Sequence, residues 1–235
     1  MKALVLTKAS HFEIQDCPVP LIGAQDVLVQ VRACGICGSD VHGMDGSTGR
    51  RQPPIIMGHE AAGVIADRDS GVTGWSIGER VMFDSTVYCG QCHFCRKGQI
   101  NLCDNRRVLG VSCNEYRRDG AFAEFVAVPQ HILYRLPEGV SFEQGAMTEA
   151  LSIAVHAVGR AGLTGGETAV VVGAGMIGLL VIQVLRAQVC RRIIAVDVDT
   201  ERLKMAGGFG ADAVLNPETA NVVQQCMQMT EGRGA

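Results

Sequence analysis

Four cysteines with close, regular spacing lie in the middle of the chain. They follow the pattern C-x2-C-x2-C-x7-C and are Cys89, Cys92, Cys95 and Cys103. Two-residue gaps place thiolates on one side of a tight loop, and a fourth sulfur arriving later closes a tetrahedron, so the pattern predicts a structural zinc site with no open position. Unpaired or disulfide-bonded cysteines are the alternative interpretation. Four sulfurs complete the shell, so we interpret His93, inside the pattern, as a bystander.

A second set of metal donors is spread over separate segments. Cys37 follows a predicted strand, and His59 and Glu60 open the next one. Thiolate, imidazole and carboxylate groups suit zinc. Glu149, a polar residue at an inward-looking position of a predicted helix, could complete this site. The alternative, a redox pair formed by Cys34 and Cys37, needs a thioredoxin-like βαβ context that is absent, so we interpret Cys34 as a small core residue.

A glycine-rich loop lies between an apolar strand and an apolar helix. Its sequence is GAGMIG, and its candidate coenzyme-binding residues are Gly173, Gly175, Met176, Ile177 and Gly178. In this context the pattern predicts a loop that holds a pyrophosphate at the helix N-terminus; an ordinary glycine turn is the alternative. Asp197, at the end of the next strand, would accept hydrogen bonds from ribose hydroxyls and repel a 2′-phosphate, which favours NAD over NADP. Arg202 points to the alternative, NADP, because a nearby arginine could bind that 2′-phosphate.

The elements that must position these residues change in type along the chain. Short strands rich in Val and Ile are expected at 2–7, 27–33, 61–66, 80–83 and 121–128. Ser141 is a predicted N-cap for a helix over 142–158. Strands at 168–172, 192–197 and 213–215 then alternate with helices at 176–188, 200–208 and from 217 onward, which predicts a parallel sheet.

We therefore expect two domains in an α/β chain: a β-rich, zinc-binding domain over 1–159 and a dinucleotide-binding domain over 160–235, with the boundary at a glycine cluster. Three strands are half of a doubly wound dinucleotide fold. The sequence thus predicts an incomplete sheet and a fragment or truncated product with weak or no activity.

Composition excludes several classes of partner. The net charge is −3 and no Lys/Arg cluster is present, which argues against nucleic acid. Glycines interrupt the longest apolar stretches, so no membrane span is expected. The N-terminal apolar run is too short for a signal peptide, and we expect a cytoplasmic protein with metal-binding thiolates.

In this order, the motifs GICGSDVH at 35–42, GHE at 58–60, the four cysteines and GAGMIG at 173–178 resemble the medium-chain, zinc-containing alcohol dehydrogenase family. The resemblance covers the chain from Met1 to Ala235. It implies a GroES-like β domain with two zinc ions, then a Rossmann domain that binds NAD. It also implies a small-molecule alcohol substrate and a homo-oligomer when full length.

Carried over by position, Cys37 and His59 would bind a catalytic zinc. Asp40 would hold the far nitrogen of His59. Ser39 and His42 would relay the proton of the substrate hydroxyl to solvent. These roles are implied by the resemblance alone.

The third zinc donor distinguishes branches of the family. The segment MTEALSIAVHA at 147–157 is similar to polyol and sorbitol dehydrogenases, in which Glu149 would match the glutamate ligand. Glu60 would be a further ligand, direct or through water. The resemblance implies oxidation of a polyol, sugar alcohol or sugar acid. The alternatives are a threonine-type or other alcohol dehydrogenase, a relative on the same fold without catalytic zinc, and a zinc-stabilised binding protein.

Three positions depart from the family pattern. Ala150 replaces a proline, which could loosen that loop, and Asp69 replaces a glycine that a left-handed turn would favour. Val189 replaces a glycine cap, and a β-branched residue there is expected to be strained.

Overall fold

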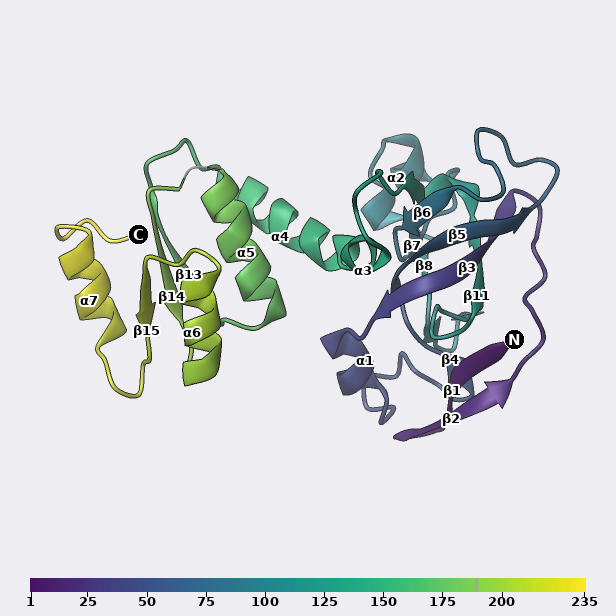
Figure 1. The fold of residues 1–235 in the computed structure, drawn as a ribbon, viewed down its shortest axis with the longest axis horizontal. Helices are drawn as coiled ribbons and strands as arrows, with labels where there is room; N and C mark the ends of the chain where they lie inside the picture. The colour runs from purple at the N-terminus through teal and green to yellow at the C-terminus, as the bar shows by residue number, and fades with distance from the viewer. Residues whose placement is uncertain (189) are drawn as a thin grey trace. The chain divides into compact units, whose positions relative to one another are not determined.

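The chain forms two structural units, Met1–Glu149 and Ala150–Ala235 (Figure 1). Short strands that contain many β-branched residues build the first unit. The structure, a computed structural model, describes residues 1–188 and 190–235. Val189, where strain was predicted, lies outside the described residues. The domain boundary predicted after residue 159 falls inside a helix, and that division stays a prediction.

An antiparallel sheet of five strands, in the order β11-β3-β5-β6-β12, organises the first unit. Alternate side chains of its strands face one core, and Val27 and Val29 are fully buried there. The strands are β3 (Asp26–Gly35), β5 (Glu60–Arg68), β6 (Arg80–Phe83), β11 (Phe125–Pro129) and β12 (Leu133–Arg135). A second sheet pairs β1 (Lys2–Lys8) with β2 (His11–Asp16) and β4 (Ile55–Ile56).

Small elements extend from these sheets. Helix α1 (Gly38–Gly43) follows β3 directly, and the cysteine-rich segment contains β7 (Thr86–Val87), α2 (His93–Arg96), η1 (Ile100–Leu102) and β8 (Arg107–Val108). Strands β9 (Val111–Ser112) and β10 (Arg117–Arg118) pair with each other, and η2 (Gln130–Ile132) precedes β12. Asp69 does not adopt a left-handed backbone; its carboxylate accepts the amides of Gln25 and Gly71.

Two helices replace the single one predicted over 142–158. Helix α3 (Phe142–Ala146) starts at the predicted cap, where the Ser141 hydroxyl accepts the Gln144 amide. Helix α4 (Thr148–Ala161) follows after Met147. The hydroxyl of Thr148 donates to the carbonyl of Gln144 across this break, a side-chain bond of the kind that bends helices.

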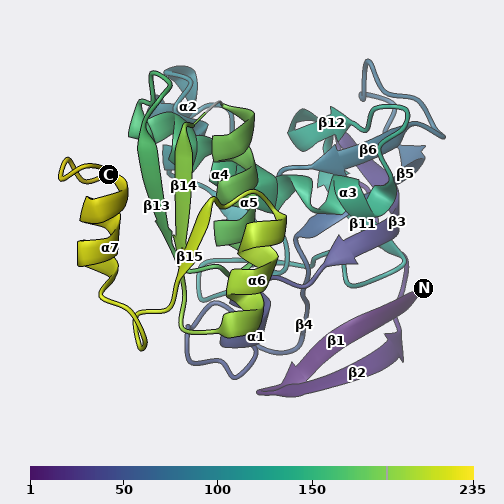
Figure 2. The same cartoon turned by 60° about the vertical axis from the view of Figure 1, so that its left-hand side comes forward.

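Three parallel strands in the order β13-β14-β15 form the sheet of the second unit (Figure 2). They are β13 (Thr168–Val172), β14 (Arg192–Val196) and β15 (Ala213–Leu215). Helices α5 (Met176–Ala187) and α6 (Thr200–Gly208) pack on one face, where Ile193 and Ala195 point. Helix α7 (Val222–Met229) packs on the other face against Ile194 and Val196.

Two predicted element starts are wrong. Helix α7 begins at residue 222 instead of 217, because Asn216 and Pro217 belong to a turn and Asn221 is the residue that caps the helix. Strand β11 begins at residue 125 instead of 121, because the amides of Ala121 and Phe122 bond to residues 57–58 outside the regular ladder.

Among the described residues, no helix is both long enough and apolar enough to cross a membrane.

Candidate functional site

The four sulfurs of Cys89, Cys92, Cys95 and Cys103, called here the cysteine cluster, lie within 4.8 Å of one another. Gly90 and Gly98 adopt positive φ angles of 71° and 75°, which lets the chain turn tightly around the sulfurs. All ten cysteines of the chain are free thiols. The ring of His93 packs edge-on against Phe94 at a centroid distance of 5.3 Å and does not belong to the cluster.

Backbone amides point at the sulfurs of this cluster. Amides of Gln91 and Cys92, together with the side chain of Asn105, lower the pKa of Cys89 to about 6. The amide of Cys89 in turn donates to the sulfur of Cys103 at 3.3 Å. Such donors stabilise thiolates, the form that binds a metal. The donor set therefore fits a tetrahedral zinc ion.

A second group of donor atoms, from Cys37, His59 and Glu60, also lies within 4.8 Å and is called here the mixed cluster. Cys37 is the N-cap of α1, while His59 and Glu60 stand at the start of β5. Antiparallel pairing of β3 with β5 places Gly35 opposite Glu60 and so brings the end of one strand to the beginning of the other. Strand register thus joins residues that are distant in sequence.

Gly35 leaves the space that the Glu60 carboxylate fills. A Cβ atom at position 35 would lie 2.4 Å from the Glu60 Oε2 atom, well inside van der Waals contact. Glu60 itself is 4% exposed. The buried carboxylate therefore depends on a glycine in the neighbouring strand.

Asp40 connects two of the three donor residues of the mixed cluster. Its Oδ2 atom accepts the backbone amide of Cys37 at 3.1 Å, and its Oδ1 atom lies 3.5 Å from the Nδ1 atom of His59. At that distance the Nδ1 atom has no hydrogen-bond partner within the described residues. The arrangement leaves the other ring nitrogen of His59 for a ligand.

Burial and charge act against each other in this cluster. Burial raises the pKa of Asp40, but contact with His59, the amide of Cys37 and the charge of Arg51 lower it below its usual value. Burial lowers the pKa of His59, but contact with Asp40 and the charges of Glu149 and Glu60 raise it above its usual value. A divalent cation between these groups would favour the neutral imidazole and the ionised carboxylates.

Glu149 lies near the mixed cluster without being part of the group within 4.8 Å among the described residues. Its Oε1 atom accepts the hydroxyl of Ser85 at 3.2 Å. Burial raises the pKa of Glu149; the charge of His59 acts in the opposite direction, and that of Glu60 adds to the rise. The carboxylate is thus close enough to interact electrostatically with the cluster.

Ser39 and His42 are both exposed residues of α1. Their spacing of three residues places them on one face of the helix. The amide of Ser39 donates to the sulfur of Cys37 at 3.5 Å, so the first of them adjoins the mixed cluster. Nearby, burial raises the pKa of Cys34 to about 12, which agrees with a core residue and not with a redox pair.

The glycine loop in the second unit follows β13. Gly173 has a φ angle of +95°, and Gly175 caps α5. A Cβ atom at Gly178 would lie 1.9 Å from the carbonyl oxygen of Gly173, so only glycine fits there. Met176 and Ile177 begin α5 and are partly exposed. This geometry suits a phosphate at the helix N-terminus.

Asp197 directly follows β14 and is tied to the glycine loop. Its Oδ2 atom accepts the amide of Ala174 at 2.7 Å, and its Oδ1 atom accepts the amide of Asp199 at 2.9 Å. These bonds lower the pKa of Asp197. The guanidinium of Arg202 lies 3.8 Å from Asp199, on an exposed part of α6.

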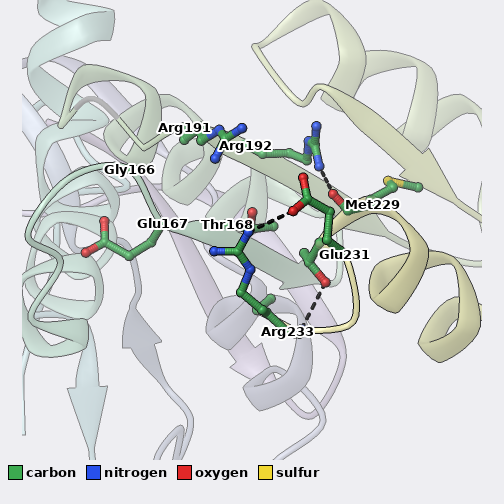
Figure 3. Close-up of a pocket in the computed structure, with 11 residues that line it drawn as sticks. Gly166, Glu167, Thr168, Arg191, Arg192, Met229, Glu231 and Arg233 are labelled. Atoms are coloured by element: carbon green, nitrogen blue, oxygen red, sulfur yellow. Dashed lines mark hydrogen bonds and ion pairs between the residues drawn. The ribbon is translucent and has the colours of Figure 1, made fainter.

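A cavity of about 290 Å³ in the second unit lies at the end of the sheet opposite to the glycine loop, where the strands begin (Figure 3). It is lined by Thr168 at the start of β13 and by Arg192 at the start of β14. Two of its arginines have partners, since Arg233 pairs with Glu231 at 2.8 Å and Arg192 donates to the carbonyl of Met229. Ligands of open α/β sheets bind at the carboxyl ends of the strands, so this cavity is not the coenzyme site.

Three residues around the site had no role in the sequence analysis: Gly35, which faces Glu60, Arg51, which contacts Asp40, and Ser85, which bonds to Glu149. The sequence analysis included Gly35 only within the motif at 35–42 and gave it no role of its own. No sequence signal marks Arg51 or Ser85, because their relevance depends on which segments fold against α1 and α4.

Comparison with known proteins identifies two family models in the chain. Residues 23–138 match the alcohol dehydrogenase GroES-like domain, and residues 177–235 match the zinc-binding dehydrogenase model. The chain is 37% identical over 239 residues to a sorbitol dehydrogenase of Halalkalibacterium halodurans, covering 100% of this chain and 68% of that protein. It is 36% identical over 225 residues to an L-threonine 3-dehydrogenase of Symbiobacterium thermophilum, covering 94% and 62%.

A solved structure of a zinc-binding dehydrogenase from Sinorhizobium meliloti, bound to NADP, superimposes with a TM-score of 0.87 at 34% identity. The match covers 95% of this chain and 64% of that one. The chain thus spans about two thirds of the length of these proteins. The predicted fold class, a GroES-like β domain followed by part of a Rossmann sheet, is confirmed.

Proposed function

Because the chain belongs to the zinc-binding alcohol dehydrogenase family, we propose that it serves zinc-dependent transfer of a hydride from a secondary alcohol to NAD. One observation carries the proposal: the thiol of Cys37, the imidazole of His59 and the carboxylate of Glu60 meet within 4.8 Å. These are the donor types that hold a catalytic zinc ion.

Cys37 and His59 would hold this ion, with Glu149 as the further protein donor and Glu60 as a ligand, direct or through water. The proximity of Asp40 to the Nδ1 atom of His59 supports the assignment, since a carboxylate there orients the imidazole. The cysteine cluster would hold a second, structural zinc ion.

When bound, the zinc ion would stabilise the negative charge of the substrate oxygen, and NAD would accept the hydride. Ser39 would accept the hydroxyl proton of the alcohol, and His42 would pass it to solvent. The exposure of both residues on one face of α1, beside Cys37, supports this path for the proton.

For the coenzyme, Gly173, Gly175 and Gly178 would let the pyrophosphate approach the start of α5, flanked by Met176 and Ile177. Asp197 would bind the ribose hydroxyls, which favours NAD. Arg202 is the reason to test NADP as well, and the similar protein from Sinorhizobium meliloti is bound to NADP.

The substrate class follows from Glu149. The glutamate matches the polyol branch, as does the similarity to a sorbitol dehydrogenase, so a sugar alcohol or related polyol is the proposed substrate. A threonine-type dehydrogenase is the second candidate, because an L-threonine 3-dehydrogenase is 36% identical.

The proposal includes a homo-oligomer when the protein is full length, a division into domains at residues 159 and 160, and a reducing, cytoplasmic location. The clustering of four sulfurs within 4.8 Å, which suits metal binding, supports the location. Sedimentation measurements on the full-length protein test the oligomer, and a monomer would contradict it.

The test combines metal content with activity. Elemental analysis of the purified chain is expected to give two zinc ions per chain, and one of them is lost from a Cys37→Ala variant. NADH formation is then measured with sorbitol, xylitol and L-threonine, before and after treatment with a chelator. One zinc ion per wild-type chain, or chelator-resistant NADH formation, would contradict the proposal.

A further inference from the structure

Arg51 is a buried cation that the proposed reaction does not use. Arg51 is 5% exposed, and its guanidinium lies 3.4 Å from the Oδ1 atom of Asp40. Its Nη1 atom donates to the carbonyl of Arg50 at 3.1 Å. A buried charge costs free energy unless it is paired, so a buried arginine beside a buried aspartate calls for an explanation.

The segment around Arg51 is held from two sides. Residue 51 forms a bridge with Ser112, whose amide donates to the carbonyl of Arg50 at 3.3 Å. On the other side, Gly43 at the end of α1 leaves room for the arginine, since a Cβ atom there would lie 2.8 Å from its Cγ atom. The guanidinium is therefore directed at Asp40 by the backbone.

Asp40 has three partners that share two oxygen atoms. Oδ2 accepts the amide of Cys37, while Oδ1 faces both His59, at 3.5 Å, and Arg51, at 3.4 Å. A carboxylate can rotate about its terminal torsion, which is broad. Without Arg51, that rotation would be restrained by the Cys37 amide at Oδ2 and by a single long contact to His59 at Oδ1. Arg51 supplies the second contact.

We propose that Arg51 is a positioning residue: its guanidinium fixes the Asp40 carboxylate, which holds the His59 ring and the Cys37 amide in the geometry that binds metal. The inference rests on the proposed catalytic zinc site. It assigns Arg51 no contact with substrate or coenzyme, and it predicts that Arg51 acts on the mixed cluster and not on the cysteine cluster.

The test compares metal binding in Arg51→Leu, Arg51→Lys and a matched control, Arg50→Leu. Arg50 is the exposed neighbour with the same side chain. Zinc affinity is measured by competition with a chromophoric chelator, and the Co²⁺-substituted chains are compared by visible absorption. Subtracting the spectrum of Cys37→Ala isolates the ion of the mixed cluster from that of the cysteine cluster.

Arg51→Leu is expected to weaken zinc binding at the mixed cluster by about 10- to 100-fold and to shift its Co²⁺ bands. Arg51→Lys, which keeps the charge, is expected to recover most of the affinity, and Arg50→Leu to match the wild type. If Arg51→Leu does not fold, Arg51→Gln, which keeps most of the side-chain length without charge, is expected to show the same weakening.

Two outcomes overturn the inference, and they differ in what else they overturn. Unchanged affinity and bands in the folded Leu or Gln variant remove the role of Arg51 but leave the proposed function intact. A wild-type chain that binds metal at the cysteine cluster alone removes both, because no second ion is then present to be positioned.

Discussion

The cysteine cluster and the mixed cluster differ in the length of chain that each needs. Cys89 and Cys103 are 14 residues apart, within one segment of turns and short helices. Cys37 and Glu60 are 23 residues apart and meet because β3 and β5 pair in one register. A local cluster can form with its own loop, whereas the mixed cluster requires the sheet to fold first. Because of this difference, we expect the two clusters to respond separately to mutation.

The largest effect is expected from His59→Ala. Loss of the imidazole removes a donor from the mixed cluster and, with it, the stabilisation of the substrate oxygen. NADH formation by a chain that shows activity should fall on the order of a thousandfold or more. Elemental analysis should still find one zinc ion, in the cysteine cluster. Loss of both ions would show that the clusters are not independent.

Cys103→Ser tests the other side of the comparison. Cys103 is the buried member of the cysteine cluster, and its loss opens the structural zinc site. We expect the free energy of unfolding in denaturant to fall on the order of 4 kcal/mol, as losses of bound metal can cause. The Co²⁺ bands of the mixed cluster should persist under conditions where the variant is folded. An unchanged denaturation midpoint would refute a structural role.

Gly35→Ala tests whether strand pairing sets the mixed cluster. The added methyl group would collide with the Glu60 carboxylate, so metal affinity at the mixed cluster should fall by about tenfold. Gly38→Ala is the matched control, because a Cβ atom there meets nothing within 4 Å. Equal affinities in the two variants, measured by chelator competition, would argue that Glu60 has no part in binding.

The smallest effect concerns a carboxylate outside both clusters. The amide and hydroxyl of Thr164 and the amide of Gly165 bond to Glu167, and they lower its pKa to about 2. A depressed pKa stabilises the fold fully above the unfolded value, near 4.5, and this stabilisation is lost as the pH falls through about 2.

Compared with Glu167→Gln, the wild type should therefore lose more stability between pH 4.5 and pH 2. Thermal melts across this range measure the difference, and zinc content at pH 7 should be equal in the two proteins. If the melting temperatures of the two proteins fall equally with pH, the bonds to Glu167 do not stabilise the folded state.

Local patterns predicted much of the second unit correctly. The strand over 168–172, the helix over 200–208 and the strand over 213–215 have their predicted bounds, because glycines and capping residues end each element within a few residues of sequence. The helix over 142–158 was predicted too simply, since the structure divides it at Met147. The sequence pattern records apolar spacing, and it does not show a break of one residue within a helical stretch.

Local spacing is enough to predict the cysteine cluster and the glycine loop, because the groups of each lie within one short segment and a helix begins directly after the loop. The tertiary structure decided the mixed cluster: it brought Cys37 to His59 and Glu60 and left Glu149 outside the tight group. It also placed Arg51 against Asp40. The physical reason is that strand register and the packing of distant loops depend on the whole core, whereas a tight turn depends on its own residues.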